Sequence, residues 1–153
     1  METLKLYNYF RSSTSYRVRL ALEFKNLKYD YLPIHLLNNG GEQNAEAYRK
    51  LNPVGGVPTL EHKGQFISQS VAIIEYLEDT FKGSPSLYPQ DSFKKAKVRQ
   101  VCEIINSDMH PLQNLKVTNY LEKNLNLSPE KKQQWLDKWI KDGLSALEKT
   151  IAP

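Results

Sequence analysis

The sequence predicts an α/β domain followed by an all-α domain, and two observations support this fold class. Residues 1–82 alternate strand-like and helix-like runs in the order β-α-β-α-β-β-α. After a segment containing glycine and prolines, residues 83–90, the strand signals cease and long amphipathic helices follow. We therefore expect an N-terminal domain over residues 1–82, a linker over residues 83–90 and a helical domain over residues 91–153.

The elements of the first domain are placed by the spacing of their apolar residues and by turn residues between them. Apolar residues at Val18, Ala21 and Leu22 share one helical face. A turn of His-Lys-Gly at residues 62–64 joins two strands as in a hairpin, and Ser70 is expected to cap the helix after them. The predicted strands are residues 4–7, 29–32, 57–61 and 65–67, and the predicted helices are residues 16–25, 42–51 (the weakest) and 70–81.

Two long helices are predicted in the second domain. The first is kinked at Pro111, and the second starts with Ser128 as N-cap and Pro129 as its first helical residue. Cys102 lies in the first apolar stripe and is expected in the core, while Trp135 and Trp139 are expected to pack. Two helices leave much apolar surface uncovered, so we expect this domain to be incomplete at its C-terminus or completed by another chain.

Composition narrows the classes of function. Charged residues make up 25% of the 153, no apolar run approaches the ~20 residues that span a bilayer, and polar residues interrupt any secretory signal pattern. A single cysteine excludes an internal disulfide and fits a reducing, cytoplasmic location, and the histidines lack metal-ligand spacing. The net charge of +4 comes without the aromatic or glycine pattern of an RNA-binding module, so neither nucleic acid nor membrane is an expected partner.

The segment Arg11–Arg19, with sequence RSSTSYRVR, places four consecutive hydroxyl residues between a strand and a helix. A helix N-terminus has unpaired N–H groups and the positive end of the helix dipole, so it attracts anions. One hydroxyl would suffice for a plain cap. The surplus of hydroxyls indicates a site for a phosphate, carboxylate or thiolate.

Three further motifs carry weaker signals. Pro58 begins a strand although it has no N–H to donate to a sheet. A cis Val57–Pro58 bond would turn the backbone N–H and C=O of Val57 outward, where they could pair with a peptide ligand. The alternative is an ordinary turn with a trans bond. Gln69-Ser70 is either a second anion-attracting helix start or a plain cap. His110–Leu115 places polar groups near the end of the long helix. Together these motifs point to a peptide-like anion as ligand.

With these motifs the chain resembles the glutathione transferase superfamily, and specifically its zeta class, the maleylacetoacetate isomerases. The resemblance extends over all 153 residues, and its most specific part is the serine-rich helix start followed by Arg-Val-Arg. It implies a thioredoxin-like N-terminal domain and an all-helical second domain that continues for several helices in the family. The exposed apolar residues of the last stripe lead us to expect a homodimer that associates through the long helices. The resemblance also implies that glutathione acts as coenzyme in the cis–trans isomerisation of maleylacetoacetate to fumarylacetoacetate, a step of tyrosine and phenylalanine catabolism.

The resemblance also assigns roles to individual residues. Ser12 would hold the glutathione sulfur and act with Ser13 in catalysis, and the substrate, a small dicarboxylic or diketo acid, would contact Arg11, His110 and Asn114. The residues implied in glutathione binding are Ser12, Ser13, Thr14, Gln43, Val57, Gln69 and Ser70. The class usually has cysteine and tryptophan where this chain has Thr14 and Tyr16, so a covalent role at residue 14 is lost.

Two alternatives to this function remain. Maleylpyruvate isomerases share the architecture, so maleylpyruvate is an alternative substrate, and glutathione transfer is a side activity to expect. A glutathione-binding or protein-interaction module on the same scaffold, without turnover, is the alternative from a different class of function.

Overall fold

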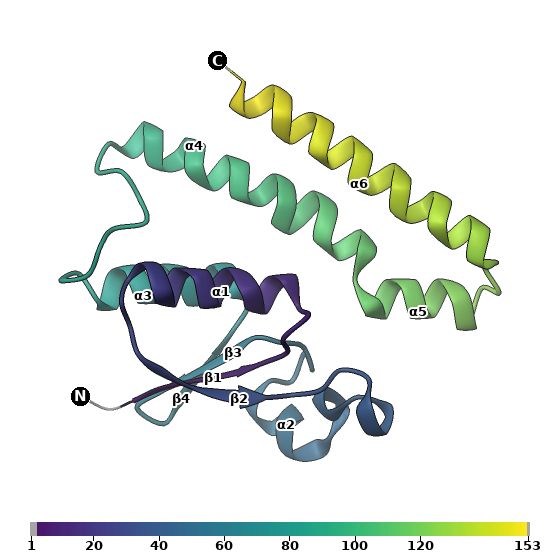
Figure 1. Cartoon of the computed structure of the whole chain (residues 1–153), viewed down its shortest axis with the longest axis horizontal. Coiled ribbons are helices and arrows are strands. Elements are labelled where there is room, and N and C mark those ends of the chain that lie inside the picture. Colours follow the sequence, from purple (N-terminus) through teal and green to yellow (C-terminus); the bar gives the residue numbers. More distant parts are fainter. Residues whose placement is uncertain (1–2, 153) are drawn as a thin grey trace. The chain divides into compact units, whose positions relative to one another are not determined.

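The computed structural model describes residues 3–152, and the chain divides into two compact units, residues 1–87 and 88–153. The first unit follows the predicted order β-α-β-α-β-β-α, so this prediction is confirmed (Figure 1). Its strands are β1 (Leu4–Asn8), β2 (Tyr29–Pro33), β3 (Thr59–His62) and β4 (Gln65–Ser68), and its helices are α1 (Ser13–Phe24), α2 (Glu46–Leu51) and α3 (Ser70–Thr80). The second unit holds α4 (Ser92–Glu103), α5 (Leu115–Lys123) and α6 (Pro129–Ile151).

The four strands form one mixed sheet in the order β2-β1-β3-β4. β1 runs parallel to β2 and antiparallel to β3, and β4 returns antiparallel beside β3. Helices α1 and α3 lie side by side over one face of this sheet, as Figure 1 shows, and α2 lies on the other side. Alternation along each strand directs apolar residues to the covered face. The core between sheet and helices consists of Leu4, Leu6, Val18, Leu22, Leu60, Ile73 and Leu77.

Two predicted helices of the first unit differ from the structure. α1 begins at Ser13, three residues before the predicted start, because Ser12 caps the helix and the following hydroxyl residues form its first turn. The weak helix predicted over residues 42–51 is divided into a 3-10 turn, Glu42–Asn44, and α2, because Ala45 between them has extended backbone angles (φ −60°, ψ 141°).

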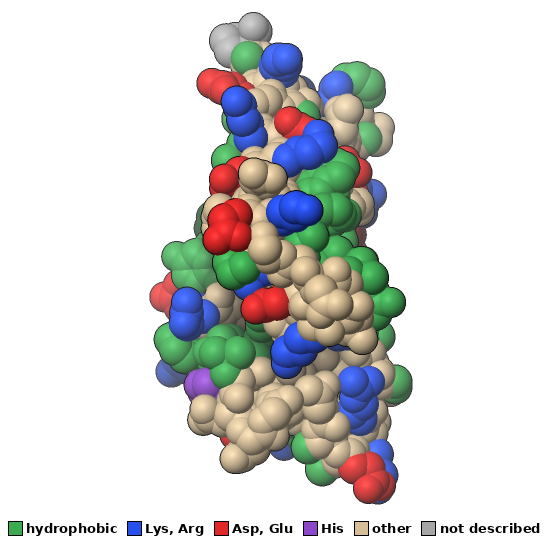
Figure 2. All heavy atoms as spheres, turned by 90° about the vertical axis from the view of Figure 1, so that its right-hand side faces the viewer, with side chains coloured by type: hydrophobic (Ala, Val, Ile, Leu, Met, Phe, Trp, Pro, Cys, Tyr) green, Lys and Arg blue, Asp and Glu red, His purple; other side chains and the backbone are tan. Residues whose placement is uncertain are grey.

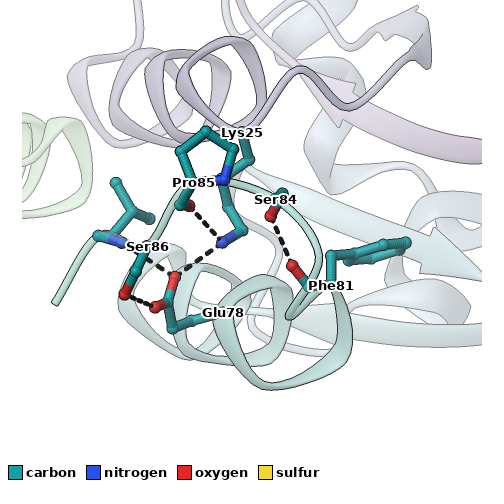
Figure 3. Close-up of polar contacts among 7 residues, drawn as sticks. Lys25, Glu78, Phe81, Ser84, Pro85 and Ser86 are labelled. Atoms are coloured by element: carbon teal, nitrogen blue, oxygen red, sulfur yellow. Dashed lines mark hydrogen bonds and ion pairs between the residues drawn. The ribbon is translucent and has the colours of Figure 1, made fainter. Parts of the chain in front are cut away.

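A buried ion pair attaches the segment after α3 to the helical layer (Figure 3). Lys25, the C-cap of α1, is 1% exposed in its side chain, and its Nζ lies 2.8 Å from Glu78 Oε2 and 2.9 Å from the Pro85 carbonyl oxygen. Ser86 Oγ and the Leu87 N–H also donate to the Glu78 carboxylate. Burial alone would raise the pKa of Glu78, but these donors and the lysine charge lower it to about 2.

The second unit departs further from the prediction. The expected long helix ends as α4 and continues as a π-helical segment, Ile104–Met109, and a 3-10 turn, His110–Gln113, where Pro111 lacks the N–H of a regular helix. α5, nine residues long, was not predicted. Cys102 is exposed, which makes its expected core position wrong. The predicted cap at Ser128 and Pro129 is confirmed, since Ser128 Oγ accepts from the Lys131 N–H at the start of α6.

Basic and acidic side chains are interspersed over the face drawn in Figure 2, so the net charge of +4 does not form one continuous positive surface there. Within residues 3–152, no helix is long and apolar enough to cross a membrane.

Candidate functional site

The strand register brings four loops of the first unit to one end of the sheet. Near the end of β1, Tyr7 lies opposite Thr59, which begins β3, and Thr59 lies opposite Ser68, which ends β4. The parallel partner β2 ends at the same level, with Pro33 beside Asn8. The segments that leave this end of the sheet are those that contain the predicted site residues Ser12, Ser13, Thr14, Gln43, Val57, Gln69 and Ser70.

Ser12 occupies the N-cap position of α1. Its backbone is extended (φ −77°, ψ 120°), its Oγ accepts from the Ser15 N–H at 3.2 Å, and its carbonyl accepts from the Tyr16 N–H at 2.9 Å. The Ser12 hydroxyl therefore lies at the positive end of the helix dipole, where an anion is stabilised. Ser13 is exposed in the first turn of the same helix.

Thr14 connects this helix start to the loop before β3. Its Oγ1 lies 2.8 Å from Ser12 Oγ and donates to the Val57 carbonyl oxygen at 3.0 Å. The Val57–Pro58 peptide bond is cis, which confirms that prediction. The Val57 N–H and C=O were expected to turn outward to pair with a peptide ligand, and in the structure the Val57 carbonyl accepts from Thr14.

A buried network of hydrogen bonds also holds the loop before β3. Tyr48 of α2 donates its hydroxyl to the Gly56 carbonyl at 2.6 Å and lies 2.8 Å from Thr59 Oγ1. Asn52 Nδ2 donates to the same carbonyl at 2.9 Å. Burial raises the pKa of Tyr48, so the phenol stays protonated and keeps its donor. The sequence analysis gave no role to Tyr48 or Asn52. They lie eleven and seven residues before Thr59, and this spacing shows no pattern that predicts the contact.

The start of α3 differs from the expected cap. The N-cap residue is Gln69 and not Ser70, which is the first helical residue and is buried. Gln69 has φ 72°, a left-handed conformation that is uncommon for residues other than glycine, and its exposed side chain makes no capping hydrogen bond. Such backbone conformations concentrate at binding sites, where the surrounding structure maintains them.

Two buried oxygen atoms of these segments lack a hydrogen-bond partner among the described residues. They are Ser15 Oγ, in the first turn of α1, and Gln43 Oε1, whose amide nitrogen makes a long contact of 3.4 Å with the Leu36 carbonyl. A buried polar atom without a partner is costly, so such atoms favour a polar ligand or water. A peptide-like anion such as glutathione, with several N–H and carboxylate groups, fits this set of donors and acceptors.

The residues predicted to contact the substrate are Arg11, in the first unit, and His110 and Asn114, in the second. Arg11 is exposed in the segment before Ser12, whereas Arg19, which was not predicted, donates to the Asn8 side chain at 2.8 Å and to the Tyr9 carbonyl, and so holds that segment. His110 and Asn114 belong to the second unit. His110 starts the 3-10 turn, and Asn114 caps α5 by accepting from the Lys116 N–H.

The arrangement of a mixed four-stranded sheet, a cis-proline loop and a serine-capped helix defines a thioredoxin-like domain, and comparison with known proteins gives the family. Residues 2–79 match the family described as "Glutathione S-transferase, N-terminal domain". Maleylacetoacetate isomerase of Dictyostelium discoideum is 47% identical over 146 residues, which are 95% of this chain and 66% of that protein. The corresponding enzyme of Pseudomonas aeruginosa is 43% identical over 97% of this chain and 69% of its own length.

Solved structures agree with these relatives. A bacterial maleylpyruvate isomerase described as a zeta-class glutathione S-transferase has a TM-score of 0.90 at 37% identity, covering 97% of this chain and 70% of that one. A maleylacetoacetate isomerase of Methylobacterium extorquens with bound malonate and GSH has a TM-score of 0.87 at 32% identity, covering 95% and 67%. The chain belongs to the glutathione S-transferase family, and within it to the zeta class. It spans about two thirds of the length of the curated relatives it matches.

Proposed function

We propose that this chain binds glutathione at the end of the sheet described above. We also propose that it is part of a glutathione-dependent isomerase that converts maleylacetoacetate to fumarylacetoacetate. The observation that carries the proposal is the Ser12 hydroxyl at the N-terminus of α1, next to the Val57 carbonyl through Thr14. The 47% identity to a maleylacetoacetate isomerase supports the choice of reaction. We place the reaction in cytoplasmic tyrosine and phenylalanine catabolism, with glutathione transfer as a side activity.

In this proposal the thiol is held by Ser12 with Ser13, and the peptide part by the Val57 backbone and the start of α3. The glutathione-binding set is Ser12, Ser13, Thr14, Gln43, Val57, Gln69 and Ser70. The candidate residues for contact with the substrate carboxylate or diketone are Arg11 in the first unit and, separately, His110 and Asn114 in the second. Glutathione held at the end of the sheet would supply a thiolate nucleophile for reversible addition chemistry at a cis double bond, with its sulfur held by Ser12 and Ser13.

The residues present can account for the ionisation of the thiol. A free thiol with a pKa of ~8.5 is only ~3% thiolate at pH 7, and lowering this pKa by two units requires ~2.7 kcal/mol of preferential stabilisation of the anion. The end of α1 contributes ~0.3–1 kcal/mol, and one hydrogen bond to a charged sulfur contributes ~1.5–3 kcal/mol. Ser12 together with the helix terminus is therefore about sufficient.

Maleylpyruvate is the second candidate substrate. The zeta-class structure with a TM-score of 0.90 is a maleylpyruvate isomerase, and both substrates carry a cis double bond between carbonyl groups. A homodimer is the assembly that we propose, because α6 has no buried residue in its 23 positions and carries exposed Leu144 and Ile151.

Substitution of Ser12 tests the proposal. Ser12→Ala should lower glutathione-dependent turnover of maleylacetone at least about tenfold at pH 7, because the thiolate loses its hydrogen bond, while calorimetry should show only modestly weaker glutathione binding. Ser128→Ala is the matched control, since it also removes an N-cap hydroxyl from a helix start. It should leave turnover unchanged.

Three results would count against parts of the proposal. Equal turnover of Ser12→Ala and the unmodified chain would remove Ser12 as the sulfur partner. Glutathione binding without turnover of maleylacetone or maleylpyruvate would favour the binding module over the isomerase. No heat of glutathione binding under any condition would contradict the proposed function altogether.

A further inference from the structure

The hydroxyls of Ser12 and Thr14 and the carbonyl of Val57 form a continuous chain of polar contacts. The distances are 2.8 Å between the two hydroxyl oxygens and 3.0 Å between Thr14 Oγ1 and the Val57 oxygen. Ser12 Oγ also accepts the Ser15 N–H at 3.2 Å. All three residues belong to the proposed glutathione-binding set: Ser12 is the sulfur partner, Val57 is the backbone partner, and Thr14 contacts both of them.

The direction of each hydrogen bond in this chain follows from counting protons. A carbonyl oxygen only accepts, so the single hydroxyl proton of Thr14 is directed to Val57. The contact between Thr14 and Ser12 must then use the proton of Ser12. Without ligand, the hydroxyl proton of Ser12 therefore points to Thr14, and Ser12 has only a lone pair to present to an approaching sulfur anion.

We propose that Thr14 is a positioning residue that reverses this chain when the peptide part of glutathione docks, an inference that rests on the proposed function. A carbonyl oxygen has two lone pairs, so a peptide N–H that pairs with the Val57 carbonyl, as in the addition of a short strand, takes one of them and weakens the hydrogen bond from Thr14. Thr14 then turns its proton to Ser12, and Ser12 turns its own proton to the sulfur. Only hydroxyl hydrogens rotate, and every proton stays on its own oxygen.

The reversed chain makes Ser12 a better donor. Its oxygen then accepts from both Thr14 and the Ser15 N–H while it donates to the thiolate, and hydrogen bonds in such a chain strengthen one another. Thr14 thus couples docking of the peptide backbone on Val57 to stabilisation of the thiolate by Ser12. A residue at position 14 without a hydroxyl cannot relay this change.

The test compares Thr14→Val, which keeps the shape and removes the hydroxyl, with Thr14→Ser, which keeps the hydroxyl. The full chain is titrated with glutathione, and the pKa of the bound thiol is measured from the ultraviolet absorbance of the thiolate. Thr14→Val should raise this pKa so that the thiolate fraction at pH 7 falls about threefold, the loss expected for one neutral hydrogen bond. Thr14→Ser should restore the value of the unmodified chain.

S-methylglutathione, which has no thiol to ionise, separates the relay from a merely structural contact. Its affinity, measured by calorimetry, should change less than about twofold in Thr14→Val, because the Val57 carbonyl loses only the hydrogen bond that docking weakens. Circular dichroism verifies folding, and Thr14→Ala replaces Thr14→Val if the latter does not fold.

The possible outcomes are distinct. A thiol pKa that is unchanged or lower in Thr14→Val overturns the relay, and so does an equal loss of affinity for both ligands with no change in thiol pKa. If the unmodified chain binds neither ligand, the proposed function fails, and this inference fails with it. If the unmodified chain lowers the thiol pKa and Thr14→Val does so equally, only the relay fails.

Discussion

The two units of the chain bury their apolar residues to very different extents. In the first unit, Leu6, Leu60 and Leu77 are 0% exposed between the sheet and its two covering helices. In the second, α6 has no buried residue in 23 positions, and Leu144 is 50% exposed. Among the described residues of that unit, Met109 is the buried apolar residue, and it is 6% exposed.

This difference shows that amphipathic patterning and burial are separate properties. A sheet face offers a broad surface that α1 and α3 cover together, so each apolar residue meets neighbours from several elements. A helix offers a narrow stripe, and the stripe becomes core only where another surface matches it. α6 contacts the 3-10 turn His110–Gln113, where Trp135 Nε1 donates to the Leu112 carbonyl at 2.7 Å.

The largest effect that we predict comes from breaking a buried ion pair in the first unit, compared with an exposed ion pair in the second. Glu78→Gln should destabilise the chain by ~3–5 kcal/mol, because it leaves Lys25 buried without its charged partner. Asp142→Asn is the control, since it breaks an exposed i,i+4 pair with Lys138 that contributes ~0.3–0.5 kcal/mol. Urea denaturation of both variants measures the difference. Equal effects of the two substitutions would contradict the contrast between the units.

The same ion pair predicts a pH dependence. The pKa of Glu78 is about 2 in the folded chain against 4.5 for an unperturbed glutamate, so its contribution is fully present above pH 4.5 and lost as the pH falls towards 2. The shift corresponds to about 3 kcal/mol. The stability difference between the unmodified chain and Glu78→Gln should therefore shrink over this window. A difference that stays constant down to pH 2 would show that the carboxylate is not held in its charged form.

The same substitution, leucine to alanine, made once in each unit compares how much a buried and a half-exposed side chain contribute to stability. Leu60→Ala should cost ~2–5 kcal/mol, because the side chain is fully buried and leaves a cavity. Leu144→Ala should change stability by no more than ~0.5 kcal/mol in the monomer, since the side chain is half-exposed. Thermal unfolding at low concentration measures both. A large loss for Leu144→Ala that depends on protein concentration would show instead that another copy covers this residue.

A smaller effect than those of Glu78→Gln and Leu60→Ala is predicted at a tightly packed place in the second unit. A Cβ at Gly143 would lie 2.0 Å from Met109 Cγ, so Gly143→Ala should destabilise by ~1 kcal/mol despite the better helix propensity of alanine. The double variant with Met109→Ala relieves the clash and should be more stable than the sum of the single effects predicts. Additive effects, measured in urea, would show that α6 and Met109 do not pack this closely.

Much of the first unit could be predicted because its signals are local. The hairpin of β3 and β4 follows from the turn at residues 62–64, and the presence of a helix after the run of hydroxyls was predicted, although its start was placed three residues too late. α5 was missed because a nine-residue helix has too few turns for a clear period, and its stability comes from packing. Cys102 was misplaced because its stripe was assigned to one continuous helix as far as Pro111, whereas the chain changes to π-helical geometry at Ile104.

The candidate site divides in the same way. The sequence by itself determined the order of the elements and placed a run of hydroxyls at the start of α1 and a candidate cis bond at Val57–Pro58, because these signals depend on residues adjacent in the chain. Only the tertiary structure decided that Thr14 engages the Val57 carbonyl and that Tyr48 supports the same loop. These contacts join residues from different elements, and their geometry is set by the register of the sheet and the packing of helices on it, which no local pattern records.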